Sequence, residues 1–234
     1  MATLSYRFDT LAATAHVPAR ARRVAVVGAS GGTGSYAVAH ALASGFHVTA
    51  LVRDPARVPL EHPALHVVAA DVMRPPTLLG VFDGHEAVLV TLGTRPEGVD
   101  RERRQRGARV CSTGTANVMA EMRTAGVRRL VVLSAAGCGD SRGLGRFGLG
   151  LLLRTLQRDR LDDHERQEAL VRASGLRWTL LRPVRFNRHA ASGRIEVGED
   201  LRWGPSTVSR DDVAEVMVRL IGQLSSIGRA LTLA

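Results

Sequence analysis

Short apolar runs alternate with longer amphipathic stretches along most of the chain. The runs have the length of buried strands, and the stretches between them have the length and periodicity of helices. Strands are predicted at residues 23–27, 47–52, 65–70, 87–91, 129–133, 178–181 and 230–233. Helices are predicted at residues 33–44, 107–125, 162–173 and 211–220, with a shorter one from Pro75 to about Gly84. This alternation predicts a Rossmann-type α/β fold: a doubly wound, mainly parallel sheet with helices on both faces.

Two segments and the N-terminus depart from this alternation. Residues 137–150 contain six glycines and are expected to form a loop over a ligand, and residues 195–203 an extended excursion. Residues 22–234 are long enough for a single α/β domain with such substrate-covering loops. Residues 1–21 have no apolar run of signal-peptide length, so a flexible N-terminal extension is expected. The clustered arginines at its end keep a transit peptide as the alternative.

A glycine-rich turn, Gly28-Ala-Ser-Gly-Gly-Thr-Gly34, joins the first strand to the first helix. In this setting Gly28 permits a sharp turn, Gly31 lets a pyrophosphate approach the backbone, and Gly34 lets the helix pack on the strand. The N–H groups and the dipole at the helix start favour phosphates. Residues 22–234 are therefore expected to be an NAD(P)-binding domain. Its turn contacts are expected from Gly28, Ser30, Gly31, Gly32, Thr33 and Gly34.

The end of the second strand indicates which cofactor is bound. An NAD-specific site usually has an acidic residue there for the ribose 2′-hydroxyl. This chain has Arg53 and Arg57 instead, which can hold a 2′-phosphate by charge-assisted hydrogen bonds. The carboxylate of Asp54 would repel that phosphate unless it turns away, and a surface ion pair is the alternative role for Arg57. NADPH is the predicted cofactor.

With these motifs placed, the chain resembles the atypical short-chain dehydrogenases/reductases of the NmrA-like type over residues 22–233. Within that family the resemblance is to the branch of biliverdin reductase B, also called flavin reductase (NADPH). Besides the glycine turn, it rests on Val48-Thr-Ala-Leu-Val-Arg-Asp54, Ala70-Asp71-Val72, Val90-Thr-Leu-Gly-Thr-Arg95, Asp162-Asp-His164, Ser174-Gly-Leu176, Gly204-Pro-Ser206 and Ser209-Arg-Asp-Asp-Val213.

The resemblance implies further cofactor contacts. Asp71 and Val72 would meet the adenine. Leu92, Gly93 and Thr94 would pass close to the ribose and the phosphates. Ser134 would end the fifth strand near the nicotinamide, and Pro183, Val184 and Arg185 would approach the same ring.

The usual catalytic pair of this superfamily is absent. A tyrosine and a lysine four residues later normally protonate the developing alkoxide, but this chain has no lysine, and its tyrosines are Tyr6 and Tyr36. At the corresponding spacing it has His164 and Glu168, which share a helix face, so Glu168 could raise the pKa of His164 for proton donation. With Ser134, these are the catalytic candidates. The alternative is that both lie in solvent on a highly charged helix, with Asp163 a further candidate on the same face.

Three functions fit these observations. The first is an NADPH-dependent reductase of a planar conjugated acceptor, flavin- or quinone-like, which takes its proton from solvent. The second is a tailoring ketoreductase or isomerase of natural-product biosynthesis. The third is a non-catalytic NADP(H)-binding regulator of the NmrA-like type. Aromatic residues are few, so only Trp203, Phe147 and Phe186 offer ring contacts, and core packing is the alternative role for each.

The formal net charge is +10, and all 32 basic residues are arginines, as GC-rich codon usage would produce. The dense basic run, Arg101-Glu-Arg-Arg-Gln-Arg106, is expected to be a solvated helix start and not a nucleic-acid site. No apolar run is long enough to span a membrane. Cys111 and Cys138 form no metal or redox motif and fit a reducing cytoplasm. The expected partner is a small-molecule acceptor, bound by a monomer or small homo-oligomer without a metal.

Overall fold

The computed structural model describes residues 5–7, 22–93, 109–145, 158–187 and 189–234. The sheet strands are β1 Ser5–Arg7, β2 Arg23–Val27, β3 His47–Val52, β4 Leu65–Ala69, β5 Ala87–Val90, β6 Arg129–Leu133, β7 Arg177–Pro183, β9 Glu196–Gly198 and β11 Arg229–Leu233. Among the described residues, these nine strands form one sheet in the order β1-β9-β11-β7-β6-β5-β2-β3-β4. The strands from β11 to β4 are all parallel, whereas β9 runs antiparallel to β11 and β1 antiparallel to β9. Two short strands, β8 Arg185–Phe186 and β10 Thr207–Val208, pair separately.

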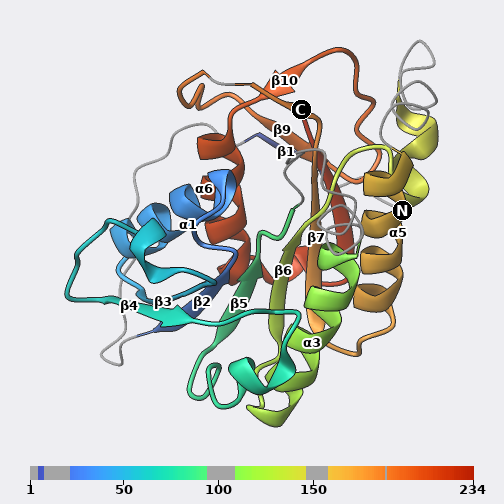
Figure 1. Ribbon diagram of the computed structural model, residues 1–234. Coiled ribbons are helices and arrows are strands. Elements are labelled where there is room, and N and C mark those ends of the chain that lie inside the picture. The colour runs from blue at the N-terminus through green and yellow to red at the C-terminus, as the bar shows by residue number, and fades with distance from the viewer. Residues whose placement is uncertain (1–4, 8–21, 94–108, 146–157, 188) are drawn as a thin grey trace, which may run out of the picture.

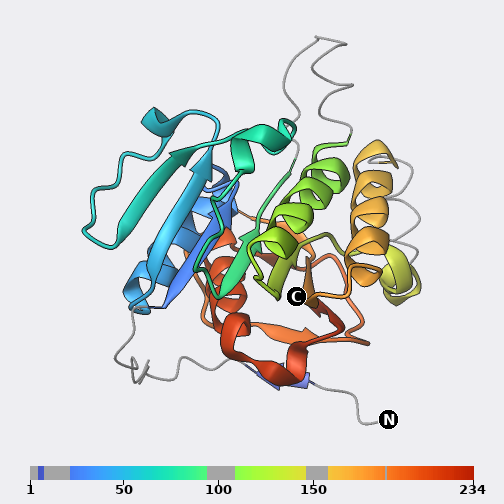
Figure 2. The ribbon, with the colours of Figure 1, turned by 90° about the horizontal axis from the view of Figure 1, so that it is seen from below.

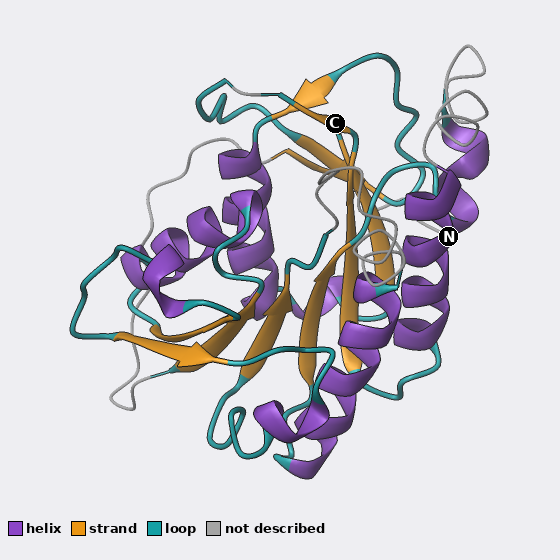
Figure 3. Ribbon diagram, viewed as in Figure 1, coloured by secondary structure: helices purple, strands orange, loops and turns teal. Residues whose placement is uncertain are grey.

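Helices cover both faces of this sheet (Figures 1 and 3). The α-helices are α1 Gly32–Ala43, α3 Val110–Thr124, α5 Arg158–Arg172 and α6 Arg210–Gly222. Short 3₁₀ helices span Pro55–Arg57, Pro75–Leu78, Gly139–Leu144 and Leu224–Ser226. α1 and α6 pack on one face, and α3 and α5 pack on the other. The predicted doubly wound Rossmann-type fold is therefore confirmed.

Two hydrophobic clusters, one on each face of the sheet, explain why the central strands are almost continuously apolar. Figure 2 shows the helices on either side of these strands from below. In β2, Val24 and Val26 pack toward α1 and α6, while Ala25 and Val27 pack toward α3. Every residue of β5 and β6 is buried. A parallel sheet covered on both faces requires this pattern, since neither face meets water.

Several element boundaries differ from those predicted. The helix expected from Pro75 to about Gly84 is only the 3₁₀ turn Pro75–Leu78, because Gly80 and Gly84 adopt φ values of +71° and +72°, which no helix allows. α5 begins four residues earlier than expected, and β7 continues through Pro183. The 3₁₀ helix Gly139–Leu144 occupies part of the expected glycine-rich loop. The basic run at 101–106, the start of the third predicted helix at 107–108 and residues 146–150 lie outside the described residues.

The N-terminal extension and the excursion at 195–203 meet at one edge of the sheet. β1 lies within the extension and pairs with β9, which lies within the excursion, with Tyr6 opposite Val197. Ser5–Arg7 is therefore a paired edge strand and not a free arm. The domain boundary at residue 22 stays a prediction. No helix in the described ranges is both long and apolar enough to cross a bilayer.

Arg129, at the start of β6, is a buried cation that caps the end of α6. Its guanidinium donates to the carbonyls of Leu220 and Ile221 in the last turn of the helix, where carbonyls lack the usual i+4 partner; the Leu220 carbonyl also accepts the N–H of Gln223 at 3.2 Å. It also donates to the carbonyl of Arg177, at 2.8 Å. Burial lowers the pKa of Arg129 to about 10, and the negative end of the helix dipole favours the charge. This contact fixes the distance between α6 and the sheet.

At its other end, α6 is tied to the excursion that precedes it. The Ser209 hydroxyl accepts the N–H of Asp212 at 3.0 Å and so caps the helix. The buried carboxylate of Asp212 accepts the N–H groups of Ser192 and Gly193 and the hydroxyls of Ser192 and Ser209. Burial alone would raise the pKa of Asp212, but these hydrogen bonds outweigh it and lower the pKa below its ordinary value.

The lowered pKa of Asp212 predicts a pH-dependent contribution to stability. At neutral pH, Asp212→Asn is expected to lower the free energy of unfolding by about 1–3 kcal/mol, because hydrogen bonds to a charged acceptor are weakened. Because the pKa of Asp212 is lowered in the folded state, its carboxylate stabilises the protein at neutral pH. This stabilisation is lost as the pH falls through the folded-state pKa. Urea unfolding of the wild type and of Asp212→Asn is measured from pH 7 to pH 3. The difference between their free energies of unfolding should become smaller below pH 3.8, the ordinary pKa of an aspartate.

Asp200→Asn is the matched control, since Asp200 is an exposed carboxylate nearby. It should leave stability unchanged at every pH. A difference between Asp212→Asn and the wild type that is independent of pH would contradict the assignment.

Candidate functional site

The expected cofactor residues follow the carboxyl ends of adjacent parallel strands. In the sheet order β4-β3-β2-β5-β6-β7, the residues at these ends are Asp71, Arg53, Gly28, Leu92, Ser134 and Pro183. They therefore lie along one edge of the sheet. From β2 the chain winds outward to β3 and β4 and then returns to β5, so the glycine turn lies at the topological switch point. Open α/β sheets bind ligands there.

The glycine turn is a tight backbone structure held against β3. Gly28 has φ +84°, which residues with a side chain rarely adopt. A Cβ added at Gly34 would lie 2.2 Å from the carbonyl oxygen of Gly28, so only glycine permits α1 to start so close to the turn. The N–H groups of Gly28 and Ala29 both donate to the carbonyl of Leu51, at 3.2 and 3.3 Å. The end of β3 therefore lies directly beside the turn.

Thr91, which follows β5, holds the turn from the opposite side. Its hydroxyl donates to the carbonyls of Val27, at 2.8 Å, and of Gly28, at 3.3 Å. An added Cβ at Gly28 would approach that hydroxyl to 3.1 Å. Thr91 was not among the residues predicted for the site. The available signal was a hydroxyl residue directly after a fully buried strand.

The start of α1 fits a phosphate group. Its N-cap is Gly31, which offers no side-chain cap, and the first turn carries no acidic residue. The N–H of Ser35 donates to the carbonyl of Gly31, so the N–H groups of the preceding residues have no partner within the helix. Gly32 is exposed, whereas Thr33 is buried and Ser30 half-buried. Uncapped N–H donors beside a side-chain-free backbone are what a pyrophosphate requires.

Arg53 and Arg57 are both exposed next to this turn. Neither forms an ion pair with another described residue, so the surface ion pair considered for Arg57 is not present there. The carboxylate of Asp54 accepts the N–H of Ala56 at 3.1 Å and caps the 3₁₀ helix Pro55–Arg57. It is thus engaged by its own backbone, and the expected repulsion of a 2′-phosphate is reduced.

Val72, which follows β4, and Leu92, which follows β5, both pack against α3. An added Cβ at Gly114 would lie 2.7 Å from Val72 and 2.9 Å from Leu92, so this glycine makes room for both side chains. Asp71 is half-buried and accepts the N–H of Met73 at 3.0 Å. Gly93 is exposed at the end of the described stretch, and Thr94 lies outside the described residues.

Ser134, Pro183 and Val184 come together beyond the ends of β6 and β7. The Ser134 N–H donates to the carbonyl of Leu181 at 2.8 Å, and the Ala136 N–H donates to the carbonyl of Pro183 at 3.0 Å. All three side chains are buried. The segment after β6 therefore runs alongside the end of β7, where the nicotinamide was expected.

Behind Ser134 lies a buried ion pair that the sequence analysis missed. Arg182 is 1% exposed and donates to both carboxylate oxygens of Glu168, at 2.8 and 2.5 Å. Glu168 also accepts the Ser134 hydroxyl at 2.6 Å, and Arg182 pairs with Asp140. Burial opposes the charge of Arg182, but Glu168 and Asp140 outweigh it and raise its pKa. An arginine in an apolar strand was the available signal, because buried charges require a partner.

His164 does not have the environment that proton donation was expected to need. It is 2% exposed, and its Nδ1 is 2.9 Å from Oε1 of Gln167, whose Nε2 donates to Thr115. Burial lowers the pKa of His164, and the smaller raising effects, that of Glu168 among them, do not compensate. Glu168 bonds Ser134 and Arg182 instead of orienting His164. The alternative, that both residues lie in solvent, is wrong, since both are buried.

Asp163, the further candidate on this helix, caps α3 from a distance. The N-cap position Arg109 supplies no side-chain cap. Instead the buried carboxylate of Asp163 accepts the N–H groups of Cys111, at 2.9 Å, and Ser112, at 3.2 Å. A carboxylate at a helix N-terminus is favoured by the dipole and by the unpaired N–H donors. Its position in α5 therefore has a structural explanation.

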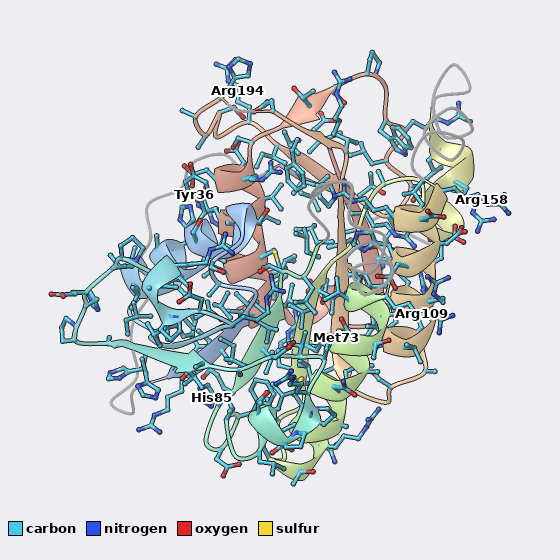
Figure 4. The ribbon with its side chains drawn as sticks, viewed as in Figure 1. Tyr36, Met73, His85, Arg109, Arg158 and Arg194 are labelled. Atoms are coloured by element: carbon cyan, nitrogen blue, oxygen red, sulfur yellow. The ribbon has the colours of Figure 1, made fainter. Side chains whose placement is uncertain are left out.

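The aromatic residues considered for ring contacts differ in how far they are buried. Trp203 is 1% exposed within the hydrophobic core, so its core-packing alternative applies. Phe186 is half-buried, with the guanidinium of Arg210 lying 4.3 Å from its ring centre. Phe147 lies outside the described residues. Tyr36 lies on the surface of α1 (Figure 4), 44% exposed.

Comparisons with known proteins agree with this architecture. A family model described as NAD(P)H-binding matches residues 28–223, from the glycine turn to just beyond α6. A protein of Arabidopsis thaliana, described as uncharacterized and chloroplastic, is 29% identical over 222 residues, which cover 88% of this chain and 74% of that protein.

Solved structures share the fold. A short-chain dehydrogenase/reductase of Veillonella parvula in complex with NADP has a TM-score of 0.76 at 18% identity, covering 92% of this chain and 95% of that chain. An anaerobillin reductase of Escherichia coli O157:H7 has a TM-score of 0.75 at 19% identity, covering 90% and 96%. An oxidoreductase of Lactococcus lactis has a TM-score of 0.74 at 19% identity, covering 90% of each chain. These similarities show a shared fold, and the family model over residues 28–223 agrees with the expected NAD(P)-binding domain.

The buried pair Glu168–Arg182 predicts strong energetic coupling. Glu168→Met or Arg182→Met alone leaves a buried charge without its partner and should lower the free energy of unfolding by about 3–5 kcal/mol. The double variant removes both charges and should recover part of that loss. Urea unfolding of the four proteins measures the coupling.

Arg158→Met is the control for this cycle. The exposed Arg158 contacts the carboxylate of Asp162 at 3.8 Å, and exposed pairs contribute about 1 kcal/mol or less. Additive losses in the double variant would show that the buried pair is not coupled.

Proposed function

The chain belongs to the NAD(P)H-binding family, and on that premise we propose that it is an NADPH-dependent reductase of a planar conjugated acceptor, flavin- or quinone-like. The observation that carries the proposal is the pairing of an uncapped glycine turn with two exposed arginines at the end of β3. Bound NADPH supplies a hydride to the acceptor. The chain's residues bind and orient the cofactor.

The proposed contacts follow the sheet edge from one end of the cofactor to the other. Arg53 and Arg57 hold the 2′-phosphate, and the N–H groups at the start of α1 hold the pyrophosphate. Asp71 and Val72 contact the adenine, and Leu92, Gly93 and Thr94 the adjoining sugar and phosphates. Pro183 and Val184 orient the nicotinamide, with Ser134 held nearby by Glu168.

A ketoreductase needs an amino-acid side chain that donates a proton to the substrate. Neither candidate for this role in the described part of the site is suited to it. His164 is buried with a lowered pKa, and the Ser134 hydroxyl is engaged by Glu168. A conjugated acceptor can take its proton from solvent, whereas an ordinary ketone needs a positioned acid. This favours the flavin- or quinone-like acceptor over a tailoring ketoreductase.

A second candidate function follows from the same observation. A protein that binds NADP(H) while its two candidate proton donors, His164 and Ser134, are buried also suits a non-catalytic regulator of the NmrA-like type. An acceptor screen separates the two candidates: NADPH consumption with free flavin or a quinone supports the reductase. Cofactor binding with no turnover of any acceptor supports the regulator.

The proposed compartment is the reducing cytoplasm. Cys111 and Cys138 are both free and buried. Burial raises the pKa of the Cys138 thiol to about 12 and raises that of Cys111 as well, so both stay protonated and unreactive. Such thiols suit a compartment that keeps cysteines reduced.

The cofactor assignment predicts a selective loss of NADPH binding in Arg53→Ala. Removing a charge-assisted contact to the 2′-phosphate should weaken NADPH binding about 10- to 100-fold and leave NADH binding unchanged. Fluorescence titration with both cofactors measures the ratio. Arg128→Ala, an exposed arginine before β6 at the opposite edge of the sheet, is the matched control and should change neither affinity. An unchanged ratio in Arg53→Ala would refute the 2′-phosphate assignment.

The proton source is tested by His164→Asn. If solvent supplies the proton, kcat should stay within about threefold of the wild type, with the same pH profile from pH 5 to 9. A general acid contributes about 10²- to 10⁴-fold, so a loss of that size would identify His164 as the donor. Because His164 is buried, thermal unfolding and NADPH titration of the variant are measured in parallel, and kcat is expressed per cofactor-bound protein.

A further inference from the structure

The amino-terminal ends of β2, β3 and β4 border a groove of about 330 Å³. Arg23 and His47 begin their strands, and His66 is the second residue of β4, so this edge of the sheet lies opposite the edge that carries the glycine turn. The other polar residues of the groove are Thr49 and His85, which is labelled in Figure 4. A groove of this volume can hold a small ligand.

The strand register places the basic side chains of the groove on one face of the sheet. Arg23 pairs with His47 across β2 and β3, and Thr49 pairs with His66 across β3 and β4. Side chains two residues apart in a strand point to the same face, so His47 and Thr49 do so. Leu51, two residues further along β3, belongs to the hydrophobic cluster on the α3 face. Three adjacent strands therefore each contribute a basic side chain to that face.

The surrounding protein does not neutralise these side chains. Arg23, His47 and His66 are exposed, and none of them forms an ion pair with another described residue. Among the described residues, no carboxylate lines the groove. Glu86, whose N–H donates to the carbonyl of Arg23, pairs through its carboxylate with Arg22 instead, at 2.7 Å. Adjacent positive charges repel each other, so the groove favours an anion.

His85 is the half-buried basic residue of the groove. Its Nε2 lies 2.8 Å from the hydroxyl oxygen of Thr49. Burial lowers the pKa of His85, and the charge of Arg23 acts in the same direction. The carbonyls of Phe82 and Asp83 and the carboxylate of Asp83 oppose this shift without cancelling it. A bound anion would offset the repulsion from Arg23 and favour the protonated ring.

We propose that this groove binds the phosphate group of a small phosphate monoester. Such a group carries about two negative charges at neutral pH, which suits donors that come from three strands. Arginine and protonated histidine both donate charge-assisted hydrogen bonds to phosphate oxygens, and a guanidinium can do so with two N–H groups. Apolar residues of the groove, Val48 and Leu65 among them, would contact the organic part of the ligand. The groove lies at the edge opposite the glycine turn, so this inference does not rest on the proposed function.

Phenyl phosphate is the probe, and isothermal titration calorimetry measures its affinity. NADPH is present in excess, so that the proposed cofactor site is filled. Arg23→Ala is expected to weaken phenyl phosphate binding about 10- to 100-fold, because hydrogen bonds to a charged group are lost. Arg128→Ala removes an exposed arginine before β6, at the same edge of the sheet but outside the groove, and should change nothing. Arg53→Ala should also leave phenyl phosphate binding unchanged.

Sulfate tests the part played by the histidines, because its charge stays constant between pH 5 and pH 8. Its affinity is expected to be about 10-fold higher at pH 5.5 than at pH 8, since protonated imidazoles add positive charge. The charged and titratable groups around His85 are Arg23 on β2, His47 on β3, His66 on β4 and Asp83 on its own loop. The double variant His47→Gln/His66→Gln should therefore lose most of this pH dependence. Thermal unfolding of all variants checks that the fold is kept.

The outcomes separate this inference from the proposed function. If Arg23→Ala binds phenyl phosphate as tightly as the wild type, or if the wild type does not bind it, the inference is overturned. If benzoate binds as tightly as phenyl phosphate, the assignment to phosphate is wrong. If Arg53→Ala weakens phenyl phosphate and Arg23→Ala does not, the probe occupies the proposed cofactor site and the inference fails. If the wild type binds no NADPH, the proposed function fails, whereas the phenyl phosphate titration still tests the groove.

Discussion

The close approach of α1 to the glycine turn is the constraint on which the arrangement of this site depends. Gly34 leaves no space for a Cβ, and the turn is held between the Leu51 carbonyl and the Thr91 hydroxyl. These contacts join the ends of β2, β3 and β5 into one rigid edge. Because parallel strands end together, the same constraint brings Arg53 and Leu92 to either side of the turn.

Charge is distributed around this edge in two different ways. Exposed arginines lie beside the turn, where a phosphate can neutralise them. Buried charges are paired within the protein, as in Arg182 with Glu168 behind Ser134 and, at the opposite edge of the sheet, Arg129 with the last carbonyls of α6. An unpaired charge in the interior would be strongly destabilising, so each buried charge is matched by hydrogen bonds. The buried charges hold the framework, and the exposed ones are available to a ligand.

The helix that was expected to supply the acid illustrates this division. In α5, Asp163 caps α3, His164 contacts Gln167, and Glu168 pairs with Arg182. The charged sequence of α5 therefore serves packing between helices and strands. An acceptor that needs no protein acid fits this arrangement. On the other face of the sheet, α6 packs beside α1, and the side chain of its Arg210 lies against Gly32 of the glycine turn.

The sequence by itself determined the fold class and the position of the glycine turn between the first strand and the first helix, because apolar periodicity and local glycine spacing are encoded in neighbouring residues. It did not determine that the Asp54 carboxylate accepts the N–H of Ala56, since a side chain's hydrogen-bond partner depends on local backbone geometry. The burial of His164 and the pairing of Arg182 with Glu168 were decided only by the tertiary structure. Those contacts join residues on separate elements, and so does the approach of Arg210 to Gly32, across 178 positions of the chain. Packing alone sets such distances, and no local pattern records them.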